Sequence, residues 1–131
     1  MQMHKNTDDY YKKKLTSEQF KVTRKKATEP PFTGKLLYVH ETGTFHCICC
    51  NAALFSSTTK YDSGSGWPSF WEPIDKSSIK EIEDLSHGMI RTEVICSSCD
   101  SHLGHLFNDG PKPTGMRYCI NSASLDFINE N

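Results

Sequence analysis

Two pairs of cysteines, each with two residues between its members, constrain the fold of this chain more than any other feature. Cys47 and Cys50 form the first pair, Cys96 and Cys99 form the second, and 45 residues separate the pairs. A structural zinc ion prefers four thiolates in a tetrahedron with Zn–S distances of about 2.3 Å, and two such knuckles supply them. We therefore expect one structural zinc ion on these four cysteines, tying together the two ends of the spacer.

Three alternatives to the four-cysteine zinc site stay open in the sequence. Iron also accepts four thiolates. His102 and His105 follow the second pair closely, and two cysteines with two histidines form a legitimate zinc set, although Cys47 and Cys50 would then have no metal. A redox role is less favoured, because a redox Cys-x-x-Cys normally stands alone in a βαβ context. The all-cysteine set uses both pairs and leaves the histidines free.

The composition narrows the class of protein. The chain has 131 residues, which predicts one domain, and a net charge of -1, which argues against a nucleic-acid partner. No stretch reaches the roughly 20 apolar residues of a membrane helix, and the N-terminus lacks the apolar core of a secretory signal. We expect a cytoplasmic monomer with a flexible charged lead-in over residues 1–14 and a single domain over residues 15–131. In a reducing compartment, six cysteines favour metal binding or catalysis.

One helix followed by a mainly antiparallel β domain is the expected order of elements. Thr16 has the position of an N-cap, and Gln19 closes a capping box for a helix over residues 17–25. The helix must end before Pro30, because the residue before a proline avoids the helical region. Beyond it, glycines separate short apolar or alternating runs, and residues 89–95 have the β-branched composition of a strand.

Cys119 is the first candidate for a reactive residue. If its segment is a strand, Arg117, Cys119 and Asn121 share one face, while Tyr118 and Ile120 point toward a core. A neighbouring guanidinium lowers the pKa of a thiol, and the thiolate is the nucleophile. The alternative is a buried structural cysteine, which is common for this residue type.

Further polar and aromatic residues favour the catalytic interpretation. Two histidines and an aspartate come shortly before Cys119, at His102, His105 and Asp109. Because histidine side chains titrate near neutral pH, they can act as proton donors and acceptors. Either histidine could instead be structural. Trp67 lies in a glycine-flanked turn that can present an indole to a ligand, although a lone tryptophan is more often a core anchor.

Taken together, these segments resemble the B-type methionine sulfoxide reductase family over residues 15–127. The shared motifs are residues 29–34 (EPPFTG), 61–64 (YDSG), 66–70 (GWPSF), 102–105 (HLGH), 117–119 (RYC) and 121–125 (NSASL). Several motifs in one order are far more specific than any single motif. The resemblance implies a mainly β fold of two antiparallel sheets in a barrel-like or tent-like arrangement, with a short N-terminal helical segment and the four-cysteine zinc site.

The resemblance also implies an activity and its residues. The substrate would be the R epimer of methionine sulfoxide, free or in peptides, and the product methionine. Cys119 would attack and become a sulfenic acid, which thioredoxin or another thiol reductant would reduce. The site would be lined by His102, His105, Asp109, Arg117 and Asn121, with His105 the most plausible proton donor and with Trp67, Ser65 and Phe107 binding the substrate.

One position departs from the family pattern. Many members carry a resolving cysteine where this chain has Ser65, and serine cannot form the disulfide that thioredoxin would reduce. Cys49 could resolve the sulfenic acid, although it lies inside a zinc knuckle. An external thiol could attack the sulfenic acid directly, which we favour. Ser65 could also be an engineered replacement.

A second class of function competes with the enzyme. The chain could be a zinc-ribbon module that binds a protein or RNA and has no catalytic thiol. The balanced charge argues against RNA, and the face with Arg117, Cys119 and Asn121 would be superfluous in a protein adaptor.

Overall fold

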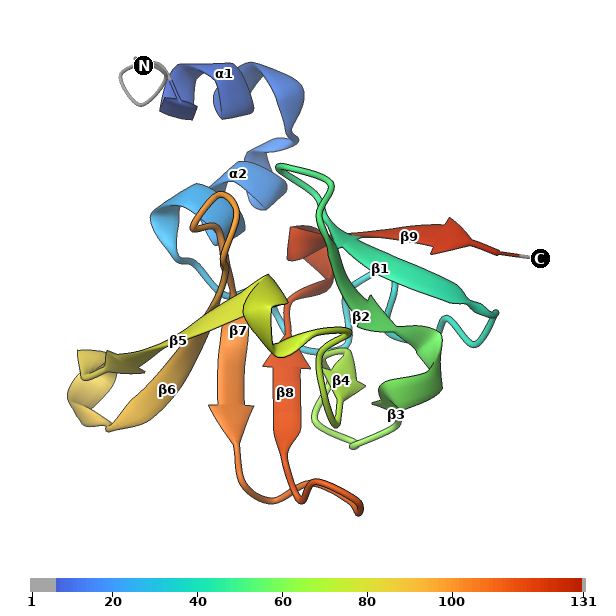
Figure 1. Cartoon of the computed structure of the whole chain (residues 1–131). Coiled ribbons are helices and arrows are strands. Elements are labelled where there is room, and N and C mark those ends of the chain that lie inside the picture. The colour runs from blue at the N-terminus through green and yellow to red at the C-terminus, as the bar shows by residue number, and fades with distance from the viewer. Residues whose placement is uncertain (1–6, 131) are drawn as a thin grey trace.

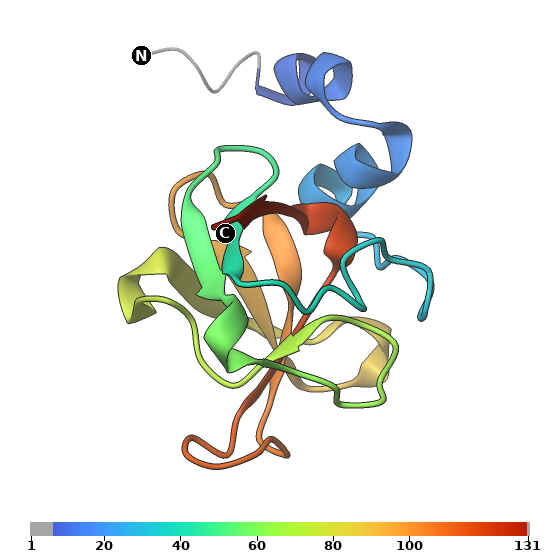
Figure 2. The same ribbon diagram turned by 90° about the vertical axis from the view of Figure 1, so that its right-hand side faces the viewer.

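Two antiparallel sheets and two N-terminal helices make up the computed structural model, which describes residues 7–130 (Figures 1 and 2). The smaller sheet has the order β2-β1-β9 and the larger the order β3-β4-β8-β7-β6-β5, with every pairing antiparallel. The strands are β1 (Gly43–Cys47), β2 (Ala53–Ser56), β3 (Lys60–Tyr61), β4 (Ser69–Phe70), β5 (Ile79–Asp84), β6 (Arg91–Cys96), β7 (His102–Phe107), β8 (Arg117–Ile120) and β9 (Leu125–Asn129). Short 3-10 turns lie between them: η2 (Ser57–Thr59), η3 (Lys76–Ser78), η4 (Ser86–Gly88) and η5 (Ser122–Ser124). The expected mainly β fold of two antiparallel sheets is confirmed.

Helix α2 (Ser17–Lys25) begins as its sequence predicts. The backbone N–H of Gln19 donates to Thr16 Oγ1 at 3.1 Å, and the backbone N–H of Thr16 donates to Gln19 Oε1 at 2.9 Å. These two bonds satisfy donors that a helix start would otherwise leave without partners. Leu15 and Phe20, which flank the cap, are both buried.

The described part of the expected lead-in forms a helix, α1 (Thr7–Lys14), while residues 1–6 lie outside the described residues. Its sequence is strongly polar, but Tyr11 packs against the core and Leu15 is buried just after its end. Arg24 of α2 also lies over the Tyr11 ring, with Cζ 5.0 Å from the ring centroid. These apolar anchors hold residues that composition alone assigns to a loose segment.

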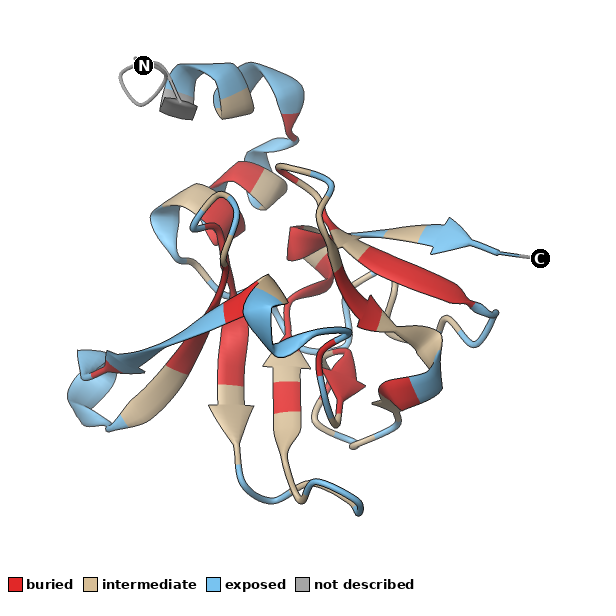
Figure 3. Cartoon of the chain, viewed as in Figure 1, coloured by how far each residue is buried: buried red, intermediate tan, exposed pale blue. Residues whose placement is uncertain are grey.

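Aromatic side chains join the two sheets. Phe45 of β1 meets Phe70 of β4 edge-on at a centroid distance of 5.1 Å, and Phe55 of β2 stacks on the same ring at 4.4 Å. All three side chains have no exposed surface. Buried residues gather where the smaller sheet, α2 and the inner ends of β6 and β7 meet (Figure 3). The contacts fix the smaller sheet over β4 and its neighbour β8.

An irregularity in the pairing of β6 and β7 controls where two histidines point. Val94 pairs with Gly104, but Ile95 pairs with His102, so β7 carries an extra residue there. In a regular strand, residues three apart point to opposite faces. The extra residue brings His102 and His105 to the same side, with ring centroids 5.5 Å apart.

Within residues 7–130, no helix has both the length and the apolar character needed to cross a membrane.

Candidate functional site

The four cysteines of the two pairs come together as one buried cluster. Cys47 Sγ lies 3.6 Å from Cys99 Sγ, Cys50 Sγ lies 3.5 Å from Cys96 Sγ, and all four sulfurs lie within 4.8 Å of one another. A tetrahedron with Zn–S bonds of about 2.3 Å has edges of about 3.8 Å, so the cluster has the size of a metal site. The set contains only soft thiol donors, which suits zinc or iron.

The two knuckles have the same backbone geometry. The N–H of Asn51 donates to Cys47 O, and the N–H of Asp100 donates to Cys96 O, both at 2.8 Å. Asn51 and Asp100 both have positive φ, at 67° and 61°. One knuckle joins β1 to β2 and the other joins β6 to β7, so the cluster links the smaller sheet to the larger one.

The alternative metal set of two cysteines and two histidines does not form. His102 Nδ1 bonds Glu93 Oε2 at 2.7 Å, and His105 Nε2 bonds Asp84 Oδ2 at 2.7 Å. The one group of candidate ligands that comes together within residues 7–130 is the four cysteines. Cys49 is buried beside this group. The pKa of Cys99 is lowered by a hydrogen bond with Cys47 and, to a smaller extent, by one with Cys49.

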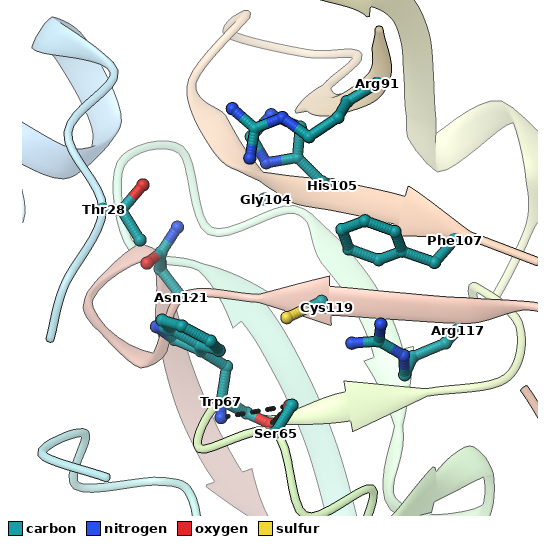
Figure 4. Close-up of a pocket in the computed structure, with 10 residues that line it drawn as sticks. All are labelled: Thr28, Ser65, Trp67, Arg91, Gly104, His105, Phe107, Arg117, Cys119 and Asn121. Carbon is teal, nitrogen blue, oxygen red and sulfur yellow. Dashed lines mark hydrogen bonds between the residues drawn. The ribbon is translucent and has the colours of Figure 1, made fainter. Parts of the chain in front are cut away.

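A pocket of about 230 Å³ lies on the opposite side of β8 from the aromatic core. This volume is below the ~300–1,000 Å³ of typical ligand sites, which suits one side chain rather than a large ligand. Figure 4 shows Cys119 between Trp67 and Asn121 on one side and Phe107 and Arg117 on the other. The residues that line the pocket are Thr28, Ser65, Trp67, Arg91, Gly104, His105, Phe107, Arg117, Cys119 and Asn121.

Strand pairing places the central residues of the pocket. His105 of β7 is the direct partner of Cys119 of β8, and Phe107 is the partner of Arg117. Directly paired residues project from the same face of a sheet. The alternation expected around Cys119 is confirmed, because Tyr118 and Ile120 are buried on the other face.

Gly104 allows β7 and β8 to approach one another at the pocket. A Cβ atom at this position would collide with the backbone carbonyl oxygen of Cys119. The glycine between the two histidines is therefore required by the packing of the strands.

The environment of Cys119 acts on its thiol in two directions. Burial raises the pKa of Cys119, and this effect outweighs the lowering by the Arg117 guanidinium and by a hydrogen bond from Ser65. The sequence predicts only the lowering by Arg117, because burial depends on the assembled pocket. Arg117 and Ser65 are the two groups that favour the thiolate in this site.

Arg117 is held in place from two sides. Its Nε and Nη2 donate to the two carboxylate oxygens of Asp109 at 2.8 and 3.2 Å. Its guanidinium lies over the Phe107 ring, with Cζ 4.4 Å from the centroid. Asp109 is largely exposed and is not among the pocket-lining residues, so it contacts the site through Arg117.

Trp67 and Asn121 are fixed by the backbone of one residue, Glu29. The indole N–H of Trp67 donates to Glu29 O at 3.0 Å, and the N–H of Glu29 donates to Asn121 Oδ1 at 3.0 Å. The Glu29 carboxylate accepts from the backbone N–H groups of Ser122 and Ala123 at 2.9 and 2.8 Å. The segment before the two prolines thus orients one wall of the pocket.

The two histidines occupy different positions. His105 lines the pocket, whereas His102 does not and is nearly fully buried. Burial, the largest effect, lowers the pKa of His102 despite its bond to Glu93. Of the residues predicted from sequence for this site, the pocket lining brings together seven: Ser65, Trp67, His105, Phe107, Arg117, Cys119 and Asn121.

Sequence reasoning missed Thr28, Arg91, Gly104 and the carboxylates of Asp84 and Glu93. Arg91, Asp84 and Glu93 belong to a hairpin that carries no motif, and their role depends on strand register. Gly104 lies inside a quoted motif, where a glycine in a strand signals a close approach of backbones.

A family model and several similar proteins of known name assign this chain to the same family. The SelR domain model matches residues 15–129. A protein of Thioalkalivibrio sulfidiphilus named peptide methionine sulfoxide reductase MsrB is 59% identical over 121 residues, covering 92% of this chain and 88% of that protein. The proteins of that name from Hahella chejuensis and Escherichia coli K12 are each 58% identical, covering 94% and 95% of this chain and 88% and 90% of their own lengths.

Proposed function

The chain belongs to the SelR-domain family and is a peptide methionine sulfoxide reductase, and we propose that it reduces the R epimer at sulfur through Cys119. The observation that carries this proposal is the direct pairing of Cys119 with His105 in a side-chain-sized pocket beside Trp67. A nucleophile and a proton donor then face the same small volume. Family membership also favours the enzyme over a zinc-ribbon adaptor.

The first step is attack of the Cys119 thiolate on the sulfoxide sulfur. A bond forms between the two sulfurs while the sulfoxide oxygen takes up a proton. Arg117 and Ser65 stabilise the thiolate against the effect of burial. The bond between the oxygen and the methionine sulfur then breaks, and the hydroxyl group passes to Cys119 Sγ as the bond between the two sulfurs breaks and methionine leaves. Cys119 is left as a sulfenic acid, so the thiol sulfur supplies the two electrons that reduce the sulfoxide.

His105 is the group that delivers the proton. It is the cross-strand partner of Cys119, so an oxygen on a sulfur attacked by Cys119 lies within its range. We assign His102 a supporting position beside His105, and Asp109 the role of orienting Arg117.

Three proposed contacts with the substrate would account for a preference for one epimer. A sulfoxide sulfur carries a methyl group, an oxygen, the rest of the methionine side chain and a lone pair. We place the methyl group against Trp67 and Phe107, the oxygen toward His105 and Asn121, and the sulfur above Cys119. With these three positions fixed, one epimer directs its chain toward solvent and the other directs it into the wall.

The regeneration step requires a thiol from outside the pocket. Cys119 is the one cysteine in its lining, and Cys49 lies beside the cluster of four cysteines. We propose that thioredoxin or another thiol reductant attacks the Cys119 sulfenic acid directly. The resulting mixed disulfide is cleaved by a second thiol, and water takes away the oxygen. A cytoplasmic monomer is the form that we expect.

One zinc ion on Cys47, Cys50, Cys96 and Cys99 completes the proposal. Four protein ligands close the coordination sphere, and the ion would supply structural cross-linking between the sheets rather than chemistry.

The test is turnover of a methionine sulfoxide peptide supplied as separated R and S epimers, with dithiothreitol as reductant. We expect methionine from the R epimer alone, and none from either epimer with Cys119→Ser. Reduction of the S epimer at a similar rate, or full activity of Cys119→Ser, would contradict the proposal.

A further inference from the structure

We propose that Asp84, in the β5–β6 hairpin outside every motif of the site, is a positioning residue that orients His105 and whose negative charge favours the form of the ring that proton delivery requires. The inference rests on the proposed role of His105 in sulfoxide reduction. Lys26, at the end of α2, forms an ion pair with the Asp84 carboxylate oxygen that does not bond His105. Neither residue lines the pocket, so both act through His105.

Behind the pocket, two histidines are matched with two carboxylates. His105 bonds Asp84 and His102 bonds Glu93, each at 2.7 Å. The second oxygen of each carboxylate faces the same cation: Lys26 Nζ lies 3.4 Å from Asp84 Oδ1 and 3.2 Å from Glu93 Oε1. The Asp84 and Glu93 side chains are 2% and 9% exposed, so these are buried charges that need compensation.

The backbone at Lys26 supports a specific role for its ammonium group. Lys26 caps α2 in the left-handed conformation, with φ 60° and ψ 30°. Glycine is the usual residue there, because a side chain in this region costs about 1–2 kcal/mol. The ion pairs with Asp84 and Glu93 account for a lysine at this position, and they raise its pKa despite the opposing effect of burial.

Asp84 decides which nitrogen of His105 carries a proton. The hydrogen bond with His105, followed by those from Ser86, holds the pKa of Asp84 well below its usual range. An ionised carboxylate only accepts hydrogen bonds, so His105 Nε2 must be the donor. Nδ1 is then the nitrogen left for substrate, and it can donate a proton only when the ring is doubly protonated. The charge of Asp84 favours that form.

The charged groups around His105 act on its ring in both directions. Asp84 and Glu93 favour the protonated ring. Arg91, whose Nη2 lies 3.5 Å from Asp84 Oδ2, opposes it, as do Lys26 and any charge on the adjacent His102. Cys119, the cross-strand partner, favours it when it is a thiolate. Asp84 is the one among them that bonds the ring directly.

The experiment follows the His105 ring by ¹⁵N NMR in protein labelled at histidine, with its signals assigned by their loss in His105→Gln. Asp84→Asn keeps a hydrogen-bond acceptor but removes the charge. We expect the pH at which His105 loses its proton to fall by about one unit. We also expect kcat to fall about tenfold, a part of the 10²–10⁴-fold that an acid contributes, while KM stays within a factor of about three.

Two further variants separate positioning from stability. Glu93→Gln removes the same charge at similar depth but from the His102 pair, so the His105 midpoint should move less than in Asp84→Asn. Lys26→Met removes the cation that opposes protonation, so the midpoint should move up, opposite in sign to Asp84→Asn. A merely structural cluster would be destabilised in all three without opposite shifts of the midpoint.

An unchanged or raised midpoint in folded Asp84→Asn would overturn the proposal. If Asp84→Asn does not fold, Lys26→Met decides, and an unchanged or lowered midpoint overturns it. The titration needs no substrate. A protein that fails to reduce either epimer but shows the opposite shifts would contradict the proposed function and leave the positioning by Asp84 intact.

Discussion

The four-thiol cluster and the Cys119 pocket both draw on the six-stranded sheet, but they surround a thiol with opposite neighbours. Each cluster thiol has other thiols within 4.8 Å and comes from a tight turn. Cys119 lies in the middle of a strand, with an imidazole, a guanidinium and a hydroxyl around it and no second cysteine in the pocket lining. The role of a cysteine is therefore set by the groups that the fold brings to it, and the two regions should respond to substitution in different ways.

Disruption of the four-thiol cluster should have the largest effect on the protein. Cys96→Ser removes one of four ligands at a position with no exposed surface. We expect loss of bound zinc and a fall in Tm of more than about 10 °C, because metal binding at a structural site contributes directly to folding. Cys49→Ser is the matched control, since it changes a buried thiol in the other knuckle that is outside the ligand set. Equal zinc loss in both, measured by elemental analysis, would contradict the four-ligand assignment.

The contact between β7 and β8 gives the next effect. In Gly104→Ala, the added methyl group meets the carbonyl of Cys119, and we expect a loss of about 1–3 kcal/mol in urea unfolding together with a fall in kcat. Gly115→Ala is the control, because Gly115 has positive φ but open space around it. It should lose about 1 kcal/mol and keep its kcat. A normal kcat in Gly104→Ala would show that the pairing of His105 with Cys119 tolerates displacement.

The sequence predicts the difference between the two regions only in part. The spacing of the four cysteines and the alternation around Cys119 are local patterns, so both regions could be located from sequence. The direction of His102 could not, because an extra residue in β7 reverses it. The carboxylates of Asp84 and Glu93 reach the histidines through the register of β5, β6 and β7, which no local pattern specifies. The helix α1 and the net effect of burial on Cys119 also depend on tertiary contacts.

A smaller effect concerns the pH dependence of the Cys119 thiol. Its thiolate is the reactive form, and its pKa is raised by burial and lowered by Arg117. Arg117→Met removes the lowering, so the pH profile of alkylation by iodoacetamide should move to higher pH by about one unit. Arg91→Met, at the other side of the same pocket, should move it less. A shift to lower pH in Arg117→Met would contradict the electrostatic role of this residue.

The smallest effect tests the hydroxyl beside Cys119. Ser65→Ala should slow single-turnover reduction by about 2–10-fold, the scale of one hydrogen bond of 0.5–1.5 kcal/mol. Ser65→Cys instead places a second thiol beside Cys119, which makes this pocket resemble the cluster. We expect it to form a disulfide with Cys119 after one turnover and to gain activity with thioredoxin. Absence of that disulfide in mapped peptides would show that position 65 lies too far away.

Trapping of the oxidised state tests the central claim most directly, namely that Cys119 alone takes the oxygen from the sulfoxide. The reduced, zinc-loaded protein is mixed with the R epimer and dimedone in the absence of any thiol reductant, and the cysteines are mapped by mass spectrometry. We predict one methionine per chain and a dimedone adduct confined to Cys119. A disulfide between Cys119 and Cys49, or an adduct at a cluster cysteine, would contradict the separation of the two regions.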